Sequence, residues 1–175
     1  MSPGSPRDRD ATGRPRNARP RDGLGRPLPR SADAGAERVP DDLAISPSEA
    51  AALGGSLLTE GRPFHAHEVF EAAWKTGPPG ERELWQGLAQ VAVGITHIRR
   101  GNAGGAVSLL RRGADRIRGY SSGADDAGVA GPRVYGIDLG FVVARAEDIA
   151  DRVDSLGLSA IPEADLRFPL SPPAS

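Results

Sequence analysis

The sequence predicts an all-α fold, an antiparallel bundle of about five helices. Apolar residues recur at spacings of three and four in several segments, as on the buried face of a helix. Signals for helix starts and stops bracket these segments, and none shows the sustained alternation of a strand, so we expect no sheet. At 175 residues the chain has room for one domain of ordinary size.

Composition divides the chain into three regions. Residues 1–45 are rich in Pro and Arg and poor in large apolar side chains, so we expect a flexible or extended leader that cannot form a core. An arginine arm for an acidic partner is the alternative, but interleaved acids dilute its charge. Residues 46–158 carry the helical pattern of the bundle domain. Prolines in residues 159–175 favour an extended tail.

Start and stop signals in the sequence define the first two helices. The run Ser46-Pro47-Ser48-Glu49 supplies an N-cap hydroxyl, a proline in the first turn and a glutamate three residues after the cap. The second helix is expected from about Pro63 to Lys75, and the Gly- and Pro-rich residues 76–80 end it.

Three more helices are expected in the rest of the chain. The third spans about residues 81–100, and Asn102 is placed to cap the fourth after Gly101. Residues 121–136 are rich in Gly, Ser and Asp and predict a loop. The fifth helix follows Asp138 as its cap and ends at Gly157.

Composition also excludes several classes of function. The chain has no cysteine, which rules out a disulfide scaffold, thiolate metal sites and a cysteine nucleophile. With 22 basic and 23 acidic residues the net charge is −1, and aromatics are only 5%, so the composition argues against nucleic acid as a partner. No apolar run suits a membrane span or a secretory signal, and we expect a soluble, cytoplasmic protein.

A histidine–glutamate cluster on the second helix is the main candidate site. His67 and Glu71 are four residues apart and project from one helix face. The H-E-x-x-E pattern is similar to the zincin motif with a carboxylate in place of the second histidine, which leaves Glu68 as a candidate general base.

The third helix carries a polar stripe that includes Gln86, Gln90 and His97, with Gly87 and Gly94 beside it. We expect the glycines to let a neighbouring helix approach, and the carboxylates of the second helix to partner the polar groups. The two helices are joined by a short loop and should pack antiparallel. Counting about 1.5 Å per residue from this loop puts Gln90 level with His67, and His97 about 10 Å further along.

Several motifs in register resemble one known family. They are the run from Gly61 to Trp74 (GRPFHAHEVFEAAW), the run LWQGLAQ at 84–90 and the pattern THxxRGNxxGA at 96–106. Together they resemble the uncharacterised family called domain of unknown function 309, over about residues 57–117. The resemblance implies a small helical bundle and a general label of predicted metal-dependent hydrolase, without an assigned substrate.

Two interpretations of the cluster remain open. In the first, His67, Glu71 and His97 bind one divalent metal, Zn, Mn or Fe, and Glu68 deprotonates bound water. In the second, the same groups form an interior hydrogen-bond network in which Glu71 accepts from Gln90 or from the Trp85 indole. The side chains expected to support either site are Gln86, Gln90, Trp74 and Trp85.

A weaker anion site is predicted where the fourth helix begins. Arg99, Arg100 and Asn102 lie beside backbone N–H groups that are free at a helix start. Three classes of function follow from the sequence. They are a metal-dependent hydrolase, a non-enzymatic bundle that binds a small anionic ligand or a protein partner, and a structural or homo-oligomerising module.

Overall fold

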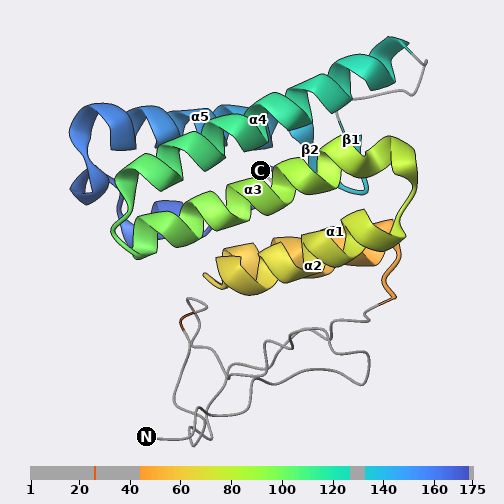
Figure 1. Cartoon of the computed structure of the whole chain (residues 1–175), viewed down its shortest axis with the longest axis horizontal. Coiled ribbons are helices and arrows are strands. Elements are labelled where there is room, and N and C mark those ends of the chain that lie inside the picture. The colour runs from red at the N-terminus through yellow and green to blue at the C-terminus, as the bar shows by residue number, and fades with distance from the viewer. Residues whose placement is uncertain (1–25, 27–43, 127–132, 174–175) are drawn as a thin grey trace, which may run out of the picture.

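Five helices pack in chain order, each against the next, in a computed structural model of the chain (Figure 1). The structure describes residues 26, 44–126 and 133–173, so the leader expected at 1–45 lies almost wholly outside the described residues. The helices are α1 (Pro47–Thr59), α2 (Pro63–Thr76), α3 (Arg82–Arg99), α4 (Ala103–Asp126) and α5 (Leu139–Leu156). The expected all-α bundle is confirmed. In this part of the chain no helix is both long and apolar enough to cross a membrane.

Local signals start the helices where the sequence predicts. The Ser46 hydroxyl accepts from the backbone N–H of Glu49, and the Glu49 carboxylate accepts from the backbone N–H of Ser46, which completes a capping box. The Asp138 carboxylate accepts from the backbone N–H of Phe141 at 2.9 Å and caps α5. A short 3-10 turn, η1 (Pro79–Glu81), separates α2 from α3.

The loop predicted over residues 121–136 is wrong in two places: α4 continues to Asp126, and a two-stranded hairpin begins at Arg133 although no sheet was expected. β1 (Arg133–Val134) pairs antiparallel with β2 (Ile137–Asp138). The two residues between the strands, Tyr135 and Gly136, have φ values of 53° and 80°, as in the tight turns that suit hairpins. Strands of two residues are too short to show alternation in a sequence, so no periodicity signal was available.

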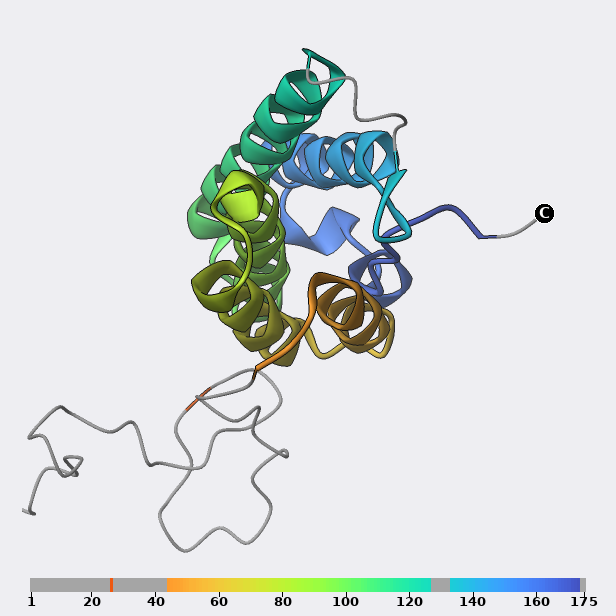
Figure 2. The same cartoon turned by 90° about the vertical axis from the view of Figure 1, so that its right-hand side faces the viewer.

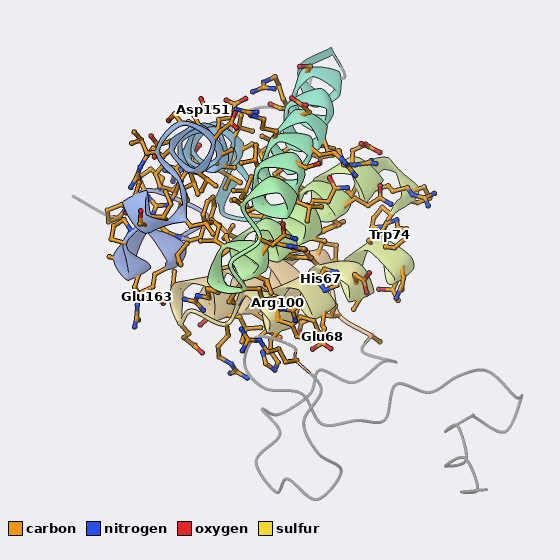
Figure 3. The ribbon with its side chains drawn as sticks, turned by 60° about the vertical axis from the view of Figure 1, so that its left-hand side comes forward. His67, Glu68, Trp74, Arg100, Asp151 and Glu163 are labelled. Carbon is orange, nitrogen blue, oxygen red and sulfur yellow. The ribbon has the colours of Figure 1, made fainter. Side chains whose placement is uncertain are left out.

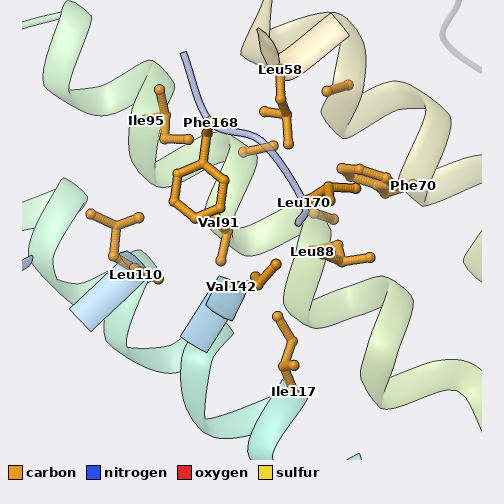
Figure 4. Packing of buried hydrophobic residues seen from close by; sticks show 14 of the residues in the cluster. Leu58, Phe70, Leu88, Val91, Ile95, Leu110, Ile117, Val142, Phe168 and Leu170 are labelled. Atoms are coloured by element: carbon orange, nitrogen blue, oxygen red, sulfur yellow. The ribbon is translucent and has the colours of Figure 1, made fainter. Parts of the chain in front are cut away.

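Residues 158–173 pack into the bundle and close it. They form two 3-10 turns, η2 (Leu158–Ala160) and η3 (Glu163–Leu166), where the proline pattern predicted an extended tail. In an end-on view the segment fills the side of the bundle between α5 and α1, and its last described residues lead away from the helices (Figure 2). Phe168 is fully buried, and its backbone N–H donates to the Leu58 carbonyl of α1 at 3.3 Å. Figure 4 shows the Phe168 ring among apolar residues of the core.

Glycines bring α3 and α4 into close contact. A Cβ at Gly87 would lie 2.6 Å from Ile117 Cγ1, and one at Gly113 would lie 2.8 Å from the Gly87 carbonyl oxygen. Gly94 meets Leu110 in the same way, at 2.8 Å. The glycines of α3 therefore face α4, which is the neighbouring helix that they allow to approach.

Candidate functional site

A pocket of about 300 Å³ lies where α2, α3 and α4 meet. α3 packs between α2 and α4. Two residues of its polar stripe, Gln86 and Gln90, lie on the side of α3 that lines the pocket. Residues from all three helices line the pocket: His67, Glu71, Trp74, Gln86, Ala89, Gln90, Val93, Leu109 and Arg116. Gln90 thus shares a pocket with His67 and Glu71, as the helix lengths predict.

The His67 imidazole and the Glu71 carboxylate form the α2 wall of the pocket. His67 Nε2 lies 3.5 Å from Glu71 Oε1, and Lys75 Nζ lies 3.6 Å from Glu71 Oε2. Hydrogen bonding from His67 lowers the pKa of Glu71, desolvation opposes that effect, and the charge of Lys75 adds to the lowering. Glu71 is therefore a carboxylate at neutral pH.

Arg116 forms the α4 wall of the pocket. Its Nη1 donates to both carboxylate oxygens of Glu83 at 2.8 Å and to Gln86 Oε1 at 2.9 Å. These contacts from α3 hold the guanidinium between the helices, where it is half-buried.

Three polar atoms of the pocket residues are buried and have no hydrogen-bond partner. They are His67 Nδ1, Gln90 Oε1 and Arg116 Nε, one from each of the three helices. A buried polar group without a partner costs about 1–3 kcal/mol. Each of these atoms has almost no accessible surface, so a molecule in the pocket cannot reach it unless the side chain moves.

The two tryptophans have different environments. Trp74 lines the pocket at the end of α2, and the Arg82 guanidinium lies 5.3 Å from its ring centroid. Trp85 is fully buried and stacks between Phe70 and Tyr135. Its indole N–H donates to Glu81 at 2.9 Å. The interpretation in which Trp85 donates to Glu71 is therefore wrong.

Glu68 does not line this pocket. It follows His67 directly, and successive helical side chains diverge by about 100°. Figure 3 shows His67 nearer to α4, and Glu68 farther from it. A base at Glu68 would therefore act from a different side of α2 than the His67–Glu71 pair.

His97 belongs to the joint between α3 and α4. Its Nδ1 lies 2.7 Å from Nδ2 of Asn102, and the Asn102 Oδ1 accepts from the backbone N–H of Gly105 at 2.9 Å. Asn102 is thus the cap of α4, as the sequence predicts, with its free amide N–H₂ turned to His97. His97 does not line the pocket of His67 and Glu71.

The residues of the predicted anion site have protein partners. Arg99 donates to the Gly61 carbonyl and to the Glu163 carboxylate, which links α3 to the α1–α2 turn and to the C-terminal segment. Arg100 is exposed at the end of α3. The side chain of Asn102 is engaged in the cap. These contacts give Arg99 and Asn102 structural roles.

The donor set does not fit a metal site built from three protein side chains. His67 and Glu71 come together, but the His97 Nδ1 is turned to Asn102. Among the described residues, no group of three or more His, Asp or Glu side chains is close enough to hold a metal ion. A closed metal centre takes more protein ligands than the pair that meets here.

The pocket includes residues that were not predicted from the sequence as site residues. Arg116 and Leu109 were not predicted as site residues, because their place in the pocket depends on the register between α3 and α4. The sequence held part of this information, because the positions of the glycines that pack together on α3 and α4 determine the register. Once Gly87 is set against Gly113, Arg116 falls opposite Glu83 and Gln86.

Comparisons with known proteins agree with the motifs. The model of the family described as "Domain of unknown function (DUF309)" matches residues 52–109, a segment from α1 into α4. The uncharacterized protein YpuF of Bacillus subtilis (strain 168) is 34% identical over 67 residues, which is 38% of this chain and 38% of YpuF. The chain thus spans well under half of that relative. No solved structure matches. The match to the DUF309 model therefore covers the part of the chain that holds His67, Glu71, Gln86, Gln90 and His97.

Proposed function

We propose that this protein binds a small molecule in the pocket between α2, α3 and α4. The observation that carries the proposal is one pocket lined by polar side chains from three helices, among them His67 of α2, Gln90 of α3 and Arg116 of α4. A volume of about 300 Å³ is at the small end of the range for small-molecule sites. Ala89, Val93 and Leu109 add the apolar lining that such sites have.

A fragment screen by ligand-observed NMR tests this proposal. The full chain is screened beside Val93→Trp, which fills the pocket from its rim, and Leu53→Trp, a matched control on the exposed surface of α1. We expect fragments to bind the wild type and Leu53→Trp but not Val93→Trp. Fragments that bind all three proteins equally would place binding elsewhere and contradict the proposal.

The metal-dependent hydrolase, with His67, Glu71 and His97 as ligands and Glu68 as base, stays a prediction. Metal content tests it, in protein expressed with ample zinc and manganese and purified without chelator. Since only two of the three ligands meet, we expect well under one metal per chain, unchanged in Glu71→Ala. One metal per chain, lost in Glu71→Ala, would restore the hydrolase interpretation.

Protein binding and oligomerisation also stay predictions. A homo-oligomer has a thermal transition that rises with protein concentration, because association stabilises the folded chain by mass action. Small-molecule binding to a monomer leaves the transition of the free protein independent of its concentration.

A further inference from the structure

Arg116 keeps one nitrogen of its guanidinium available to a ligand. Its Nη1 is used by the Glu83 carboxylate and by Gln86 Oε1. Its Nε is buried, whereas Nη2 has no hydrogen-bond partner among the described residues and is not one of the buried atoms. The side chain is 33% exposed and lines the pocket, so Nη2 is the donor that a bound molecule can reach.

Gln86 offers a second donor close to Arg116. Only the oxygen of an amide can accept a hydrogen bond, so the bond from Arg116 fixes Gln86 with Oε1 toward the guanidinium. Its Nε2 stays available, because it has no partner in the described part of the chain and is not buried. Two donors of this kind match the two oxygens of a carboxylate.

The two carboxylates nearest to these donors are compensated within the protein. Glu71 lines the pocket, and its Oε2 lies 3.6 Å from Lys75 Nζ. Glu83 lies 2.8 Å from Arg116 Nη1. Each negative charge therefore has a positive partner of its own, which limits its repulsion of an anion in the pocket.

Two further arginines next to the pocket have no such compensation. The Arg82 guanidinium lies 5.3 Å from the ring centroid of Trp74, which lines the pocket. Arg112 lies one turn before Arg116 on α4, and it donates to the Ser108 hydroxyl at 3.0 Å. Neither guanidinium forms an ion pair with a described carboxylate. Their charges therefore make the surroundings of the pocket positive, which favours an anion.

From these donors and this charge, we infer that the pocket takes a small organic acid, a carboxylate with a short apolar body. The inference rests on the proposed small-molecule function and adds its ligand class. The carboxylate accepts from Arg116 Nη2 and Gln86 Nε2. The apolar body packs on Ala89, Val93 and Leu109, which line the same pocket. Because Arg116 is already shared with a protein carboxylate, a single negative charge suits it better than a phosphate dianion.

Titrations of the full chain with four probes test the inference. Hexanoate has the proposed head and body, hexanamide has an uncharged head, hexylamine has the opposite charge, and inorganic phosphate is an anion without a body. Two-dimensional NMR gives the affinity, and the side-chain signals of Gln86 and Trp74 give the location. We expect hexanoate to bind saturably, to shift both signals and to bind more weakly at high salt. The other three probes should bind about tenfold more weakly or less.

Gln86→Glu distinguishes an anion from other ligands. It keeps the size of the side chain and an acceptor for Arg116, but it replaces the available N–H₂ with a carboxylate oxygen. Ala144→Glu is the matched control, because it adds the same charge at an exposed position of α5 that does not line the pocket. We expect Gln86→Glu to weaken hexanoate binding about tenfold or more, and Ala144→Glu to leave it unchanged.

Any of the other three probes binding the pocket as tightly as hexanoate would overturn the inference and leave the pocket function standing. The same holds if fragments from the screen bind the pocket and hexanoate does not, or if Gln86→Glu binds hexanoate as tightly as the wild type. Hexanoate that leaves the Gln86 and Trp74 signals unmoved, together with fragments that bind Val93→Trp as well as the wild type, would overturn both. The comparison of probes uses the wild type alone, so it decides the inference even if Gln86→Glu does not fold.

Discussion

The hydrogen bonds of Asn102 determine which nitrogen of His97 accepts. The Asn102 oxygen is used by the backbone N–H of Gly105, so the group that faces His97 is the amide N–H₂. His97 Nδ1 must then be the acceptor, with the ring proton on Nε2. The ring is thus a structural acceptor behind the α4 cap. Through these contacts His97, Asn102 and Gly105 form one structural unit at the start of α4.

Gly105→Ala tests this role of His97. A Cβ at Gly105 would lie 2.5 Å from Asn102 Nδ2 and 2.7 Å from His97 Nδ1, so the two side chains would have to separate. We expect the free energy of unfolding to fall by about 1–2 kcal/mol, the usual cost of a lost N-cap, in denaturant titrations. Gly104→Ala is the matched control, because a Cβ there meets nothing within 4 Å. Equal effects of the two substitutions would mean that the contact of His97 with Asn102 adds no stability.

At the scale of the elements, local chemistry was enough to predict the helices. The capping box at Ser46 and the cap at Asp138 depend on neighbours within three residues, which the sequence displays directly. The pairing of helices depends on distant contacts. Gly87 was identified correctly as a point of close approach, but its partner could be either neighbour, and the structure places α4 there.

The same distinction between local and distant contacts applies to the site. His67, Glu71 and Gln90 were predicted to face each other, because a short loop and a fixed rise per residue determine the register of α2 against α3. Arg116 was missed, because its place depends on how α3 and α4 pack. Its hydrogen bond to Glu83 links residues 33 positions apart, and no sequence pattern within one helix predicts such a pair.

The close contact of α3 and α4 is tested by Gly113→Ala. A Cβ there would lie 2.8 Å from the Gly87 carbonyl oxygen and 3.1 Å from the Val91 backbone nitrogen, and backbone atoms cannot turn aside. We expect the helices to be forced apart at a cost of about 1–3 kcal/mol, measured by denaturant unfolding. The wall at Arg116 should shift as well, seen as NMR shifts at Gln86.

Gly119→Ala supplies the control on the same helix. A Cβ at Gly119 meets nothing within 4 Å, so the substitution should raise stability by up to about 1 kcal/mol through helix propensity alone. A stabilised Gly113→Ala protein would contradict the tight packing of α3 on α4.

At the scale of the whole molecule, the C-terminal segment completes the core. Its buried residues come from a stretch that proline content alone predicts to be extended. Periodicity does not reveal them, because 3-10 turns and irregular backbone have no long repeat. Arg99 fastens this segment to α3 through Glu163, and Arg152 of α5 donates to the Ala160 carbonyl at 2.8 Å. Both contacts lie near the C-terminal ends of α3 and α5. The backbone N–H of Asp138, at the start of α5, also donates to the Leu170 carbonyl at 2.8 Å and holds the segment near the opposite end of that helix.

Phe168→Ala measures how much this closure stabilises the protein. The ring is fully buried, and the Arg145 guanidinium lies 5.4 Å from its centroid. Its removal should lower the free energy of unfolding by about 3–5 kcal/mol, a large part of the 5–15 kcal/mol typical of a domain. Since that variant can fail to fold, Phe168→Leu provides a smaller loss in a folded protein. Arg167→Ala, at the exposed neighbouring position, should change stability little. If Phe168→Leu and Arg167→Ala unfold at the same denaturant concentration as the wild type, the segment does not hold the bundle closed.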